Sequence, residues 1–173
     1  YGAGGVSVHD GLAYFFACST VGFLNQGCRV ARVPVARADE RAAFTFFDGS
    51  AWTPDMNRAA VVIDHVAAGV SITRNPYLGC YLAVTGTVFR SALTLRTSDR
   101  IEAGWSAQAG ATLEAATGGP IFPAVMGEYD YLFLEHPALR SADDRQIVVS
   151  YSRPLGNFRG EVRLARITLR ASP

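Results

Sequence analysis

Residues 69–74 read Gly-Val-Ser-Ile-Thr-Arg and repeat the pattern of residues 5–9, which read Gly-Val-Ser-Val-His. Each stretch precedes a turn and then an aromatic strand, at residues 13–16 in the first copy and residues 80–83 in the second. A looser third copy begins at residues 131–136, which read Tyr-Leu-Phe-Leu-Glu-His. Because the copies recur with a period of about sixty residues and about four strands each, the repeat predicts the blades of a β-propeller.

The copies divide the chain into units at residues 1–55, 56–110 and 111–173. The first two units each contain a Trp-bearing turn, at residues 48–53 and 102–106, whereas the third stops before such a turn. A propeller ring needs about four blades or more to close. We therefore expect one partial propeller domain, with about three four-stranded antiparallel blades in an incomplete ring.

The rest of the chain has the same all-β character. Runs rich in Val, Ile, Phe, Tyr and Thr are interrupted roughly every eight to twelve residues by Gly, Pro, Asn or Asp. Only residues 39–43 and 54–60 suit a helical turn, and both are too short for a stable helix. Alternating arginines mark the third predicted strand of each unit: Arg29 and Arg32, Arg90 and Arg96, Arg163 and Arg166. We expect them to pair with Asp48, Asp99 or Glu161 between blades rather than to bind a ligand.

The composition limits the classes of partner. Hydrophobic residues make up 49% of the 173 residues and charged residues 18%, which excludes a disordered chain. A net charge of +1 argues against binding to nucleic acid or to an anionic membrane surface. No apolar run approaches the roughly 18 residues of a membrane-spanning helix. We expect neither nucleic acid nor membrane as a partner.

Five short phrases resemble one family of propellers. They are Asp-Gly-Ser-Ala-Trp at residues 48–52, the stretch 71–81, the stretch 95–99, Ala-Gly-Trp-Ser at 103–106, and His-Pro-Ala-Leu at 136–139 followed by residues 149–152. Together they look like secreted bacterial five-bladed β-propellers, a group that includes domains of unknown function, the endo-D-arabinofuranases and, distantly, arabinanase-like and inulinase-like glycoside hydrolases. The resemblance covers residues 1–169 and implies a five-bladed fold and a glycan as the substrate class.

The resemblance also implies a division of the catalytic groups. In these enzymes one essential carboxylate lies on the innermost strand of the first blade, and the resemblance implies that this chain corresponds to the last three blades. We expect a carbohydrate-acting, glycoside hydrolase-like protein whose catalytic set is incomplete in this chain. The alternative is a non-catalytic propeller module that binds a glycan or a protein. In either case we expect the missing N-terminal blades, or another chain, to complete the propeller.

Glu128 and Asp130 are the candidate catalytic residues. Two carboxylates two positions apart on an extended segment share one face, and glycoside hydrolysis requires two carboxylates that flank the scissile bond. We expect Glu128 or Asp130 to lie near the mouth of the central channel, within reach of Asp64 or His65. The alternative is a pair of solvated acids in a loop between blades.

The candidate substrate-binding residues fall at two kinds of position. Asp64 and His65 precede an innermost strand, where a propeller binds ligands, while Arg74, Glu135 and His136 lie at the ends of repeated strands, just before a turn. The alternative for the strand-end residues is packing against a neighbouring blade. We expect no cofactor and no metal ligand set, although the resemblance leaves room for a cation such as calcium in the channel. Calcium prefers oxygen ligands, which argues against a direct bond from histidine.

Two of the three cysteines suit a disulfide. Residues 12–18 and 28–35 read as neighbouring antiparallel strands around a loop at 19–27, which sets Cys18 opposite Cys28. The alternative is two small apolar residues beside a loop. Since disulfides persist in oxidising compartments, a bond would agree with a secreted or periplasmic protein.

Overall fold

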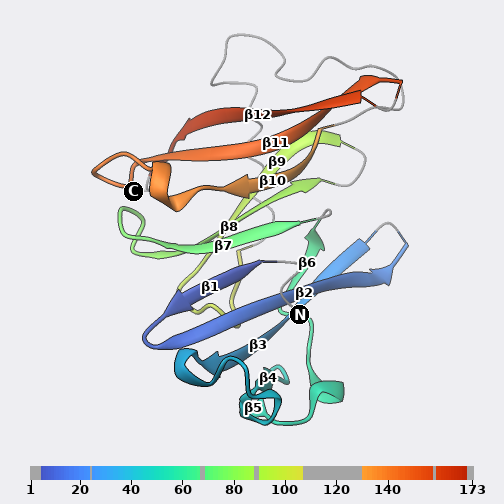
Figure 1. Ribbon diagram of the computed structural model, residues 1–173, viewed down its shortest axis with the longest axis vertical. Helices are drawn as coiled ribbons and strands as arrows, with labels where there is room; N and C mark the ends of the chain where they lie inside the picture. Colours follow the sequence, from blue (N-terminus) through green and yellow to red (C-terminus); the bar gives the residue numbers. More distant parts are fainter. Residues whose placement is uncertain are drawn as a thin grey trace.

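The computed structural model describes residues 5–23, 25–66, 69–87, 90–106, 130–157 and 159–170. Within these residues the protein is all-β, as predicted, and contains no α-helix. Its strands form three antiparallel sheets, which lie one above another in Figure 1.

The first sheet is the largest. Its strand order is β1-β2-β3-β4-β5, and β6 pairs with β3 away from this path. The bounds are β1 Val6–His9, β2 Leu12–Gly22, β3 Asn25–Pro34, β4 Thr45–Phe47, β5 Trp52–Thr53 and β6 Ile63–Val66. The short 3₁₀ turns η1 Val35–Arg37, η2 Arg41–Ala43 and η3 Met56–Arg58 lie between these strands, and η2 and η3 fall within the two predicted helical turns.

The second and third sheets have three strands each. The second has the order β7-β8-β9 and the third the order β10-β11-β12. Their bounds are β7 Val70–Asn75, β8 Cys80–Thr87, β9 Arg90–Ser98, β10 Tyr131–Glu135, β11 Gln146–Gly156 and β12 Arg159–Thr168, with the 3₁₀ turn η5 Pro137–Leu139 after β10. The sheets therefore differ from the four equal strands expected. Beside β9 the Ser106 amide donates to the Thr97 carbonyl, at 2.8 Å, and the Thr97 amide donates to the Ser106 hydroxyl, at 3.0 Å, but no fourth strand is formed among the described residues.

The second sheet is buried on both faces, which explains the nearly continuous apolar sequence of β8. Tyr81 and Ala83 pack in one core with the first sheet. Leu82 and Val84 point the other way and pack in a second core with the third sheet, around Phe133. Successive side chains of a strand point to opposite faces, so this one strand joins both cores.

The first strands of the three sheets, β1, β7 and β10, lie side by side and run in the same direction (Figure 1). The Glu135 amide donates to the Ser71 hydroxyl across β10 and β7, at 2.7 Å. Between β1 and β7 the approach is closer, because a Cβ atom added to Gly5 would lie 2.5 Å from the Val70 carbonyl oxygen. Gly5 also has φ +121°, so only glycine fits this junction.

This arrangement defines two ends of the molecule. At the starting end β1, β7 and β10 begin, and antiparallel pairing brings the β2–β3 and β11–β12 turns there too. At the far end the same three first strands finish, near His9, Asn75 and Glu135. The predicted site residues fall at both ends.

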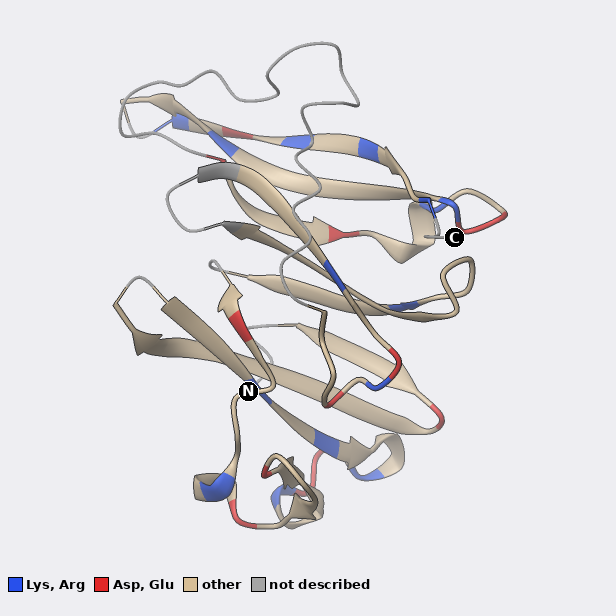
Figure 2. Cartoon of the chain, turned by 180° about the vertical axis from the view of Figure 1, so that it is seen from behind, with Lys and Arg blue, Asp and Glu red and all other residues tan. Residues whose placement is uncertain are grey.

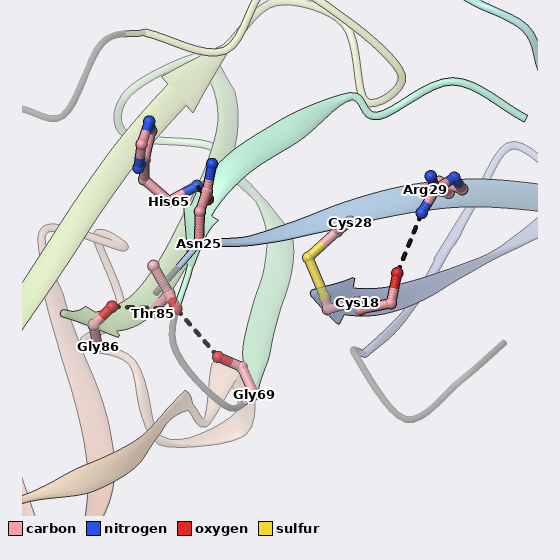
Figure 3. The surroundings of a disulfide bond; sticks show 9 residues. Cys18, Asn25, Cys28, Arg29, His65, Gly69, Thr85 and Gly86 are labelled. Carbon is pink, nitrogen blue, oxygen red and sulfur yellow. Dashed lines mark hydrogen bonds between the residues drawn. A yellow bond between two sulfur atoms is a disulfide. The ribbon is translucent and has the colours of Figure 1, made fainter. Parts of the chain in front are cut away.

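The β2–β3 hairpin carries the disulfide. Cys18 lies directly opposite Cys28 in the strand register, and a bond joins their sulfur atoms at 1.98 Å (Figure 3). The expectation of a loop at residues 19–27 was wrong: pairing continues past the cysteines to Gly22 opposite Asn25. Val21 and Val61 pack over Gly27, and β6 pairs with β3 at Gln26, so tertiary contacts extend the hairpin.

We expect the double variant Cys18→Ala/Cys28→Ala to lose about 2–3 kcal/mol of unfolding free energy, because the bond closes a short loop in the unfolded chain. Urea denaturation without reductant measures the loss. Cys80→Ala is the matched control, since Cys80 is a free thiol. Equal urea midpoints for the double variant and the wild-type protein would contradict the expectation.

Candidate functional site

Asp64 and His65 stand at the starting end, on β6. The strand buries Ile63 and Val66 at its two ends and exposes the two polar residues between them. His65 has φ +52°, a left-handed conformation that is rare for a residue other than glycine and interrupts the alternation of a normal strand. Its backbone N–H donates to the Asn25 side-chain oxygen at 2.9 Å, which ties β6 to the start of β3 (Figure 3).

Arg96 approaches Asp64 from the core. It lies opposite Ala83 in the β8–β9 pairing, on the face that packs towards the first sheet. Its side chain is only 6% exposed, and one terminal nitrogen lies 3.4 Å from Asp64 Oδ1. Among the residues that the structure describes, the buried Arg96 Nε has no hydrogen-bond partner. His65 Nε2 lies 3.7 Å from the other Asp64 oxygen, so three side chains from two sheets meet here.

This cluster of Asp64, His65 and Arg96, which we call the Asp64 cluster, has defined chemical capacities. The carboxylate and the imidazole are both more than half exposed and can accept or donate hydrogen bonds to a ligand. Arginine stays charged and is weakly hydrated, which suits a buried position beside a carboxylate. A left-handed backbone and an unsatisfied buried donor are costly features that concentrate at functional sites.

Asp130 also lies at the starting end, immediately before β10, but it is enclosed. Asp130 is 3% exposed and Arg153 is 8% exposed. Arg153 donates to both carboxylate oxygens, from Nε at 3.0 Å and from a terminal nitrogen at 2.9 Å. This hydrogen bonding raises the pKa of the Arg153 guanidinium. Glu128, the other predicted catalytic residue, lies outside the described residues.

Glu135, at the far end, belongs to a buried network between the second and third sheets. Its side chain is 0% exposed. Arg140 Nε donates to one carboxylate oxygen at 2.7 Å, and the Thr73 hydroxyl donates to the other. Arg140 also donates to the Arg74 carbonyl at 2.8 Å. The structure differs from the expectation of a ligand-facing acid, because sheet packing covers this strand end.

The other two strand-end residues also contact protein groups. The Arg74 guanidinium lies over the Tyr81 ring, 5.5 Å from its centroid. His136 Nε2 lies 2.7 Å from the Ser150 hydroxyl. Each contact lies within a single sheet, so the two do not show the packing against a neighbouring blade that the alternative reading expected. The structure thus brings Asp64 and His65 together and places Arg74, Glu135 and His136 at the opposite end of the sheets.

The remaining features around the Asp64 cluster are the distribution of charged side chains and of possible metal ligands. Figure 2 shows acidic and basic residues interspersed over the sheets and turns. No group of three or more His, Cys, Asp or Glu side chains suited to a metal gathers in the part of the chain that the structure describes. Among these residues no helix is long and apolar enough to span a membrane.

Sequence reasoning assigned one of the two arginines that organise these clusters to the wrong partner and overlooked the other. Arg96 is among the alternating arginines expected to pair with Asp48, Asp99 or Glu161, but its carboxylate partner is Asp64, 32 residues earlier in the chain. Arg140 was not noticed, and its contacts with Thr73 and Arg74 cross more than 60 residues. The only available signal was the cost of burying an arginine, which requires an acid somewhere in the fold.

Comparisons with known proteins place the chain in a family. No curated protein matches the sequence. The family described as Domain of unknown function (DUF4185) matches residues 3–152, most of the chain. The protein therefore belongs to the DUF4185 family.

Proposed function

We propose that this chain is the C-terminal part of a carbohydrate-acting five-bladed β-propeller and that it binds a glycan at the Asp64 cluster. In this proposal the three sheets are successive blades, and N-terminal blades or another chain complete the ring. The side-by-side first strands β1, β7 and β10 support it, because propeller blades meet along their innermost strands around a central channel.

The Asp64 cluster is the observation that carries the proposal. The Asp64 carboxylate is exposed to solvent on one side and forms an ion pair with the buried Arg96 on the other. A sugar offers several hydroxyl groups, each of which donates and accepts hydrogen bonds, and an exposed carboxylate beside an imidazole matches both roles. Hydrogen bonds to an ionised carboxylate are stronger than neutral ones, so Asp64 is the expected anchor.

Binding is favoured over hydrolysis among the described residues. A general acid must hold a proton within reach of the leaving oxygen. Asp130, the described member of the predicted catalytic pair, is buried with both oxygens hydrogen-bonded to Arg153. It is engaged as a structural ion pair in this arrangement, so we propose a glycan-binding role for this part of the propeller.

The disulfide bond bears on the cellular compartment in which the protein works. A Cys18–Cys28 bond is stable in an oxidising compartment. We propose that the protein is secreted or periplasmic, where extracellular glycans are within reach.

The test is titration calorimetry of the disulfide-intact protein with D-arabinofuranose, L-arabinofuranose and inulin-type oligosaccharides. We expect one probe class to bind and Asp64→Asn to weaken that binding about tenfold, equivalent to about 1.4 kcal/mol. Asp39→Asn, at an exposed acid away from the cluster, is the control. The proposal fails if no probe binds, or if Asp64→Asn binds as tightly as the wild-type protein. Release of reducing ends from a bound probe would instead indicate hydrolysis.

A further inference from the structure

The most exposed large apolar side chain among the described residues stands at the starting end. Phe23 is 94% exposed and occupies the tip of the β2–β3 hairpin, where the pairing of Gly22 with Asn25 closes the strands. Val21 and Val61, 40% and 39% exposed, flank its base. Their side chains meet above Gly27, since a Cβ atom there would lie 3.1 Å from Val21 and 2.8 Å from Val61. We call Val21, Phe23 and Val61 the tip patch.

The tip patch adjoins the Asp64 cluster. Asn25 follows Phe23 by two residues, so their Cα atoms are within roughly 7 Å of each other. The Asn25 side chain accepts the His65 backbone N–H, and His65 is the neighbour of Asp64 (Figure 3). One hydrogen bond thus connects the base of the hairpin tip to the strand that carries the exposed carboxylate.

The hairpin that bears Phe23 is braced from both strands. The Cys18–Cys28 disulfide joins them below the tip, and Arg29 donates to the Ser19 hydroxyl at 3.1 Å (Figure 3). The pairing of β6 with β3 adds a third strand. A braced hairpin backbone loses little conformational entropy when it binds a ligand, which favours affinity.

We propose that Phe23 is a stacking platform for one sugar ring of the glycan, with Val21 and Val61 at its side; this inference rests on the proposed function. A sugar ring has an apolar face of C–H bonds and a polar rim of hydroxyls. Binding sites combine an aromatic surface with a few placed polar groups, and the tip patch and the Asp64 cluster supply one each. A single exposed apolar residue needs no ligand, but two further partly exposed apolar side chains, Val21 and Val61, and the Asp64 cluster lie at the same end of the molecule.

The test uses the same oligosaccharide probes with variants at the tip. We expect Phe23→Ala to weaken binding about tenfold and Phe23→Trp to retain it, with the new indole fluorescence shifting when the probe is added. The thermal midpoint of Phe23→Ala should match that of the wild-type protein, because the side chain is exposed. Val162→Ala is the matched control, since Val162 is 73% exposed on β12 of the third sheet.

Failure of this inference can be told from failure of the proposed function. If Asp64→Asn weakens binding and Phe23→Ala does not, the platform is wrong and the glycan site stands. If the wild-type protein binds no probe, both are overturned. Sedimentation with phosphatidylcholine–phosphatidylglycerol vesicles tests a membrane role for the tip. Vesicle binding that Phe23→Ala abolishes, with oligosaccharide binding unchanged, would also overturn the platform.

Discussion

We expect Arg140→Met to lower the free energy of unfolding by about 3–5 kcal/mol, because it leaves a buried carboxylate without its cation. Glu135 has a fully buried side chain, and Arg140 supplies its charged partner. The same arginine joins β10 to β7 through the Thr73 hydroxyl and the Arg74 carbonyl. In a thermal melt the loss corresponds to a midpoint roughly 6–20 °C lower.

Two further variants separate this cost from other effects. Arg58→Met removes an ion pair with Asp48 in which the arginine is 62% exposed, and we expect it to cost at most about 1 kcal/mol. The double variant Glu135→Leu/Arg140→Met removes both buried charges, so it should be more stable than Arg140→Met alone. If the thermal midpoints of Arg140→Met and Arg58→Met agreed within error, the Glu135–Arg140 network would have no structural role.

We expect Asp130→Ala to cost a similar amount, about 3–5 kcal/mol, because the buried Arg153 would lose the carboxylate that accepts from both its Nε and a terminal nitrogen. Both oxygens of Asp130 are engaged by this arginine, and the two residues join the start of β10 to β11. Asp130→Asn keeps the size of the side chain and one acceptor oxygen, so we expect a smaller loss. Urea denaturation of both variants measures the difference.

The same variants test the catalytic hypothesis for Asp130. If Asp130 is structural, Asp130→Asn lowers the unfolding midpoint, and oligosaccharide binding at a temperature where the variant is folded stays near that of the wild-type protein. If Asp130 is a catalytic acid, Asp130→Asn abolishes the release of reducing ends and leaves the unfolding midpoint unchanged. The second result would contradict the structural role.

The β-class, the approximate strand positions and the register of the cysteines could be predicted from the sequence. These features depend on contacts between residues near one another in the chain: period-two alternation, turn residues and hairpin pairing. Cys18 and Cys28 lie ten residues apart on one hairpin, so local pairing alone sets them opposite each other. The repeat of residues 5–9 at residues 69–74 also predicted that Asp64 and His65 lie just before β7, the first strand of the second sheet.

The roles of the charged residues were decided by the packing of one sheet on another. Arg96 meets Asp64, and Arg140 meets Glu135, only because separate sheets bring their strands together. A sequence shows that Glu135 ends a strand, but the neighbouring sheet determines whether that end faces solvent or a buried arginine. Burial and charge pairing depend on contacts across 30 to 70 residues of chain, whereas strand alternation depends on residues two apart. For that reason the sequence alone determines the approximate positions of the strands, while only the tertiary structure distinguishes a ligand-facing acid from a structural one.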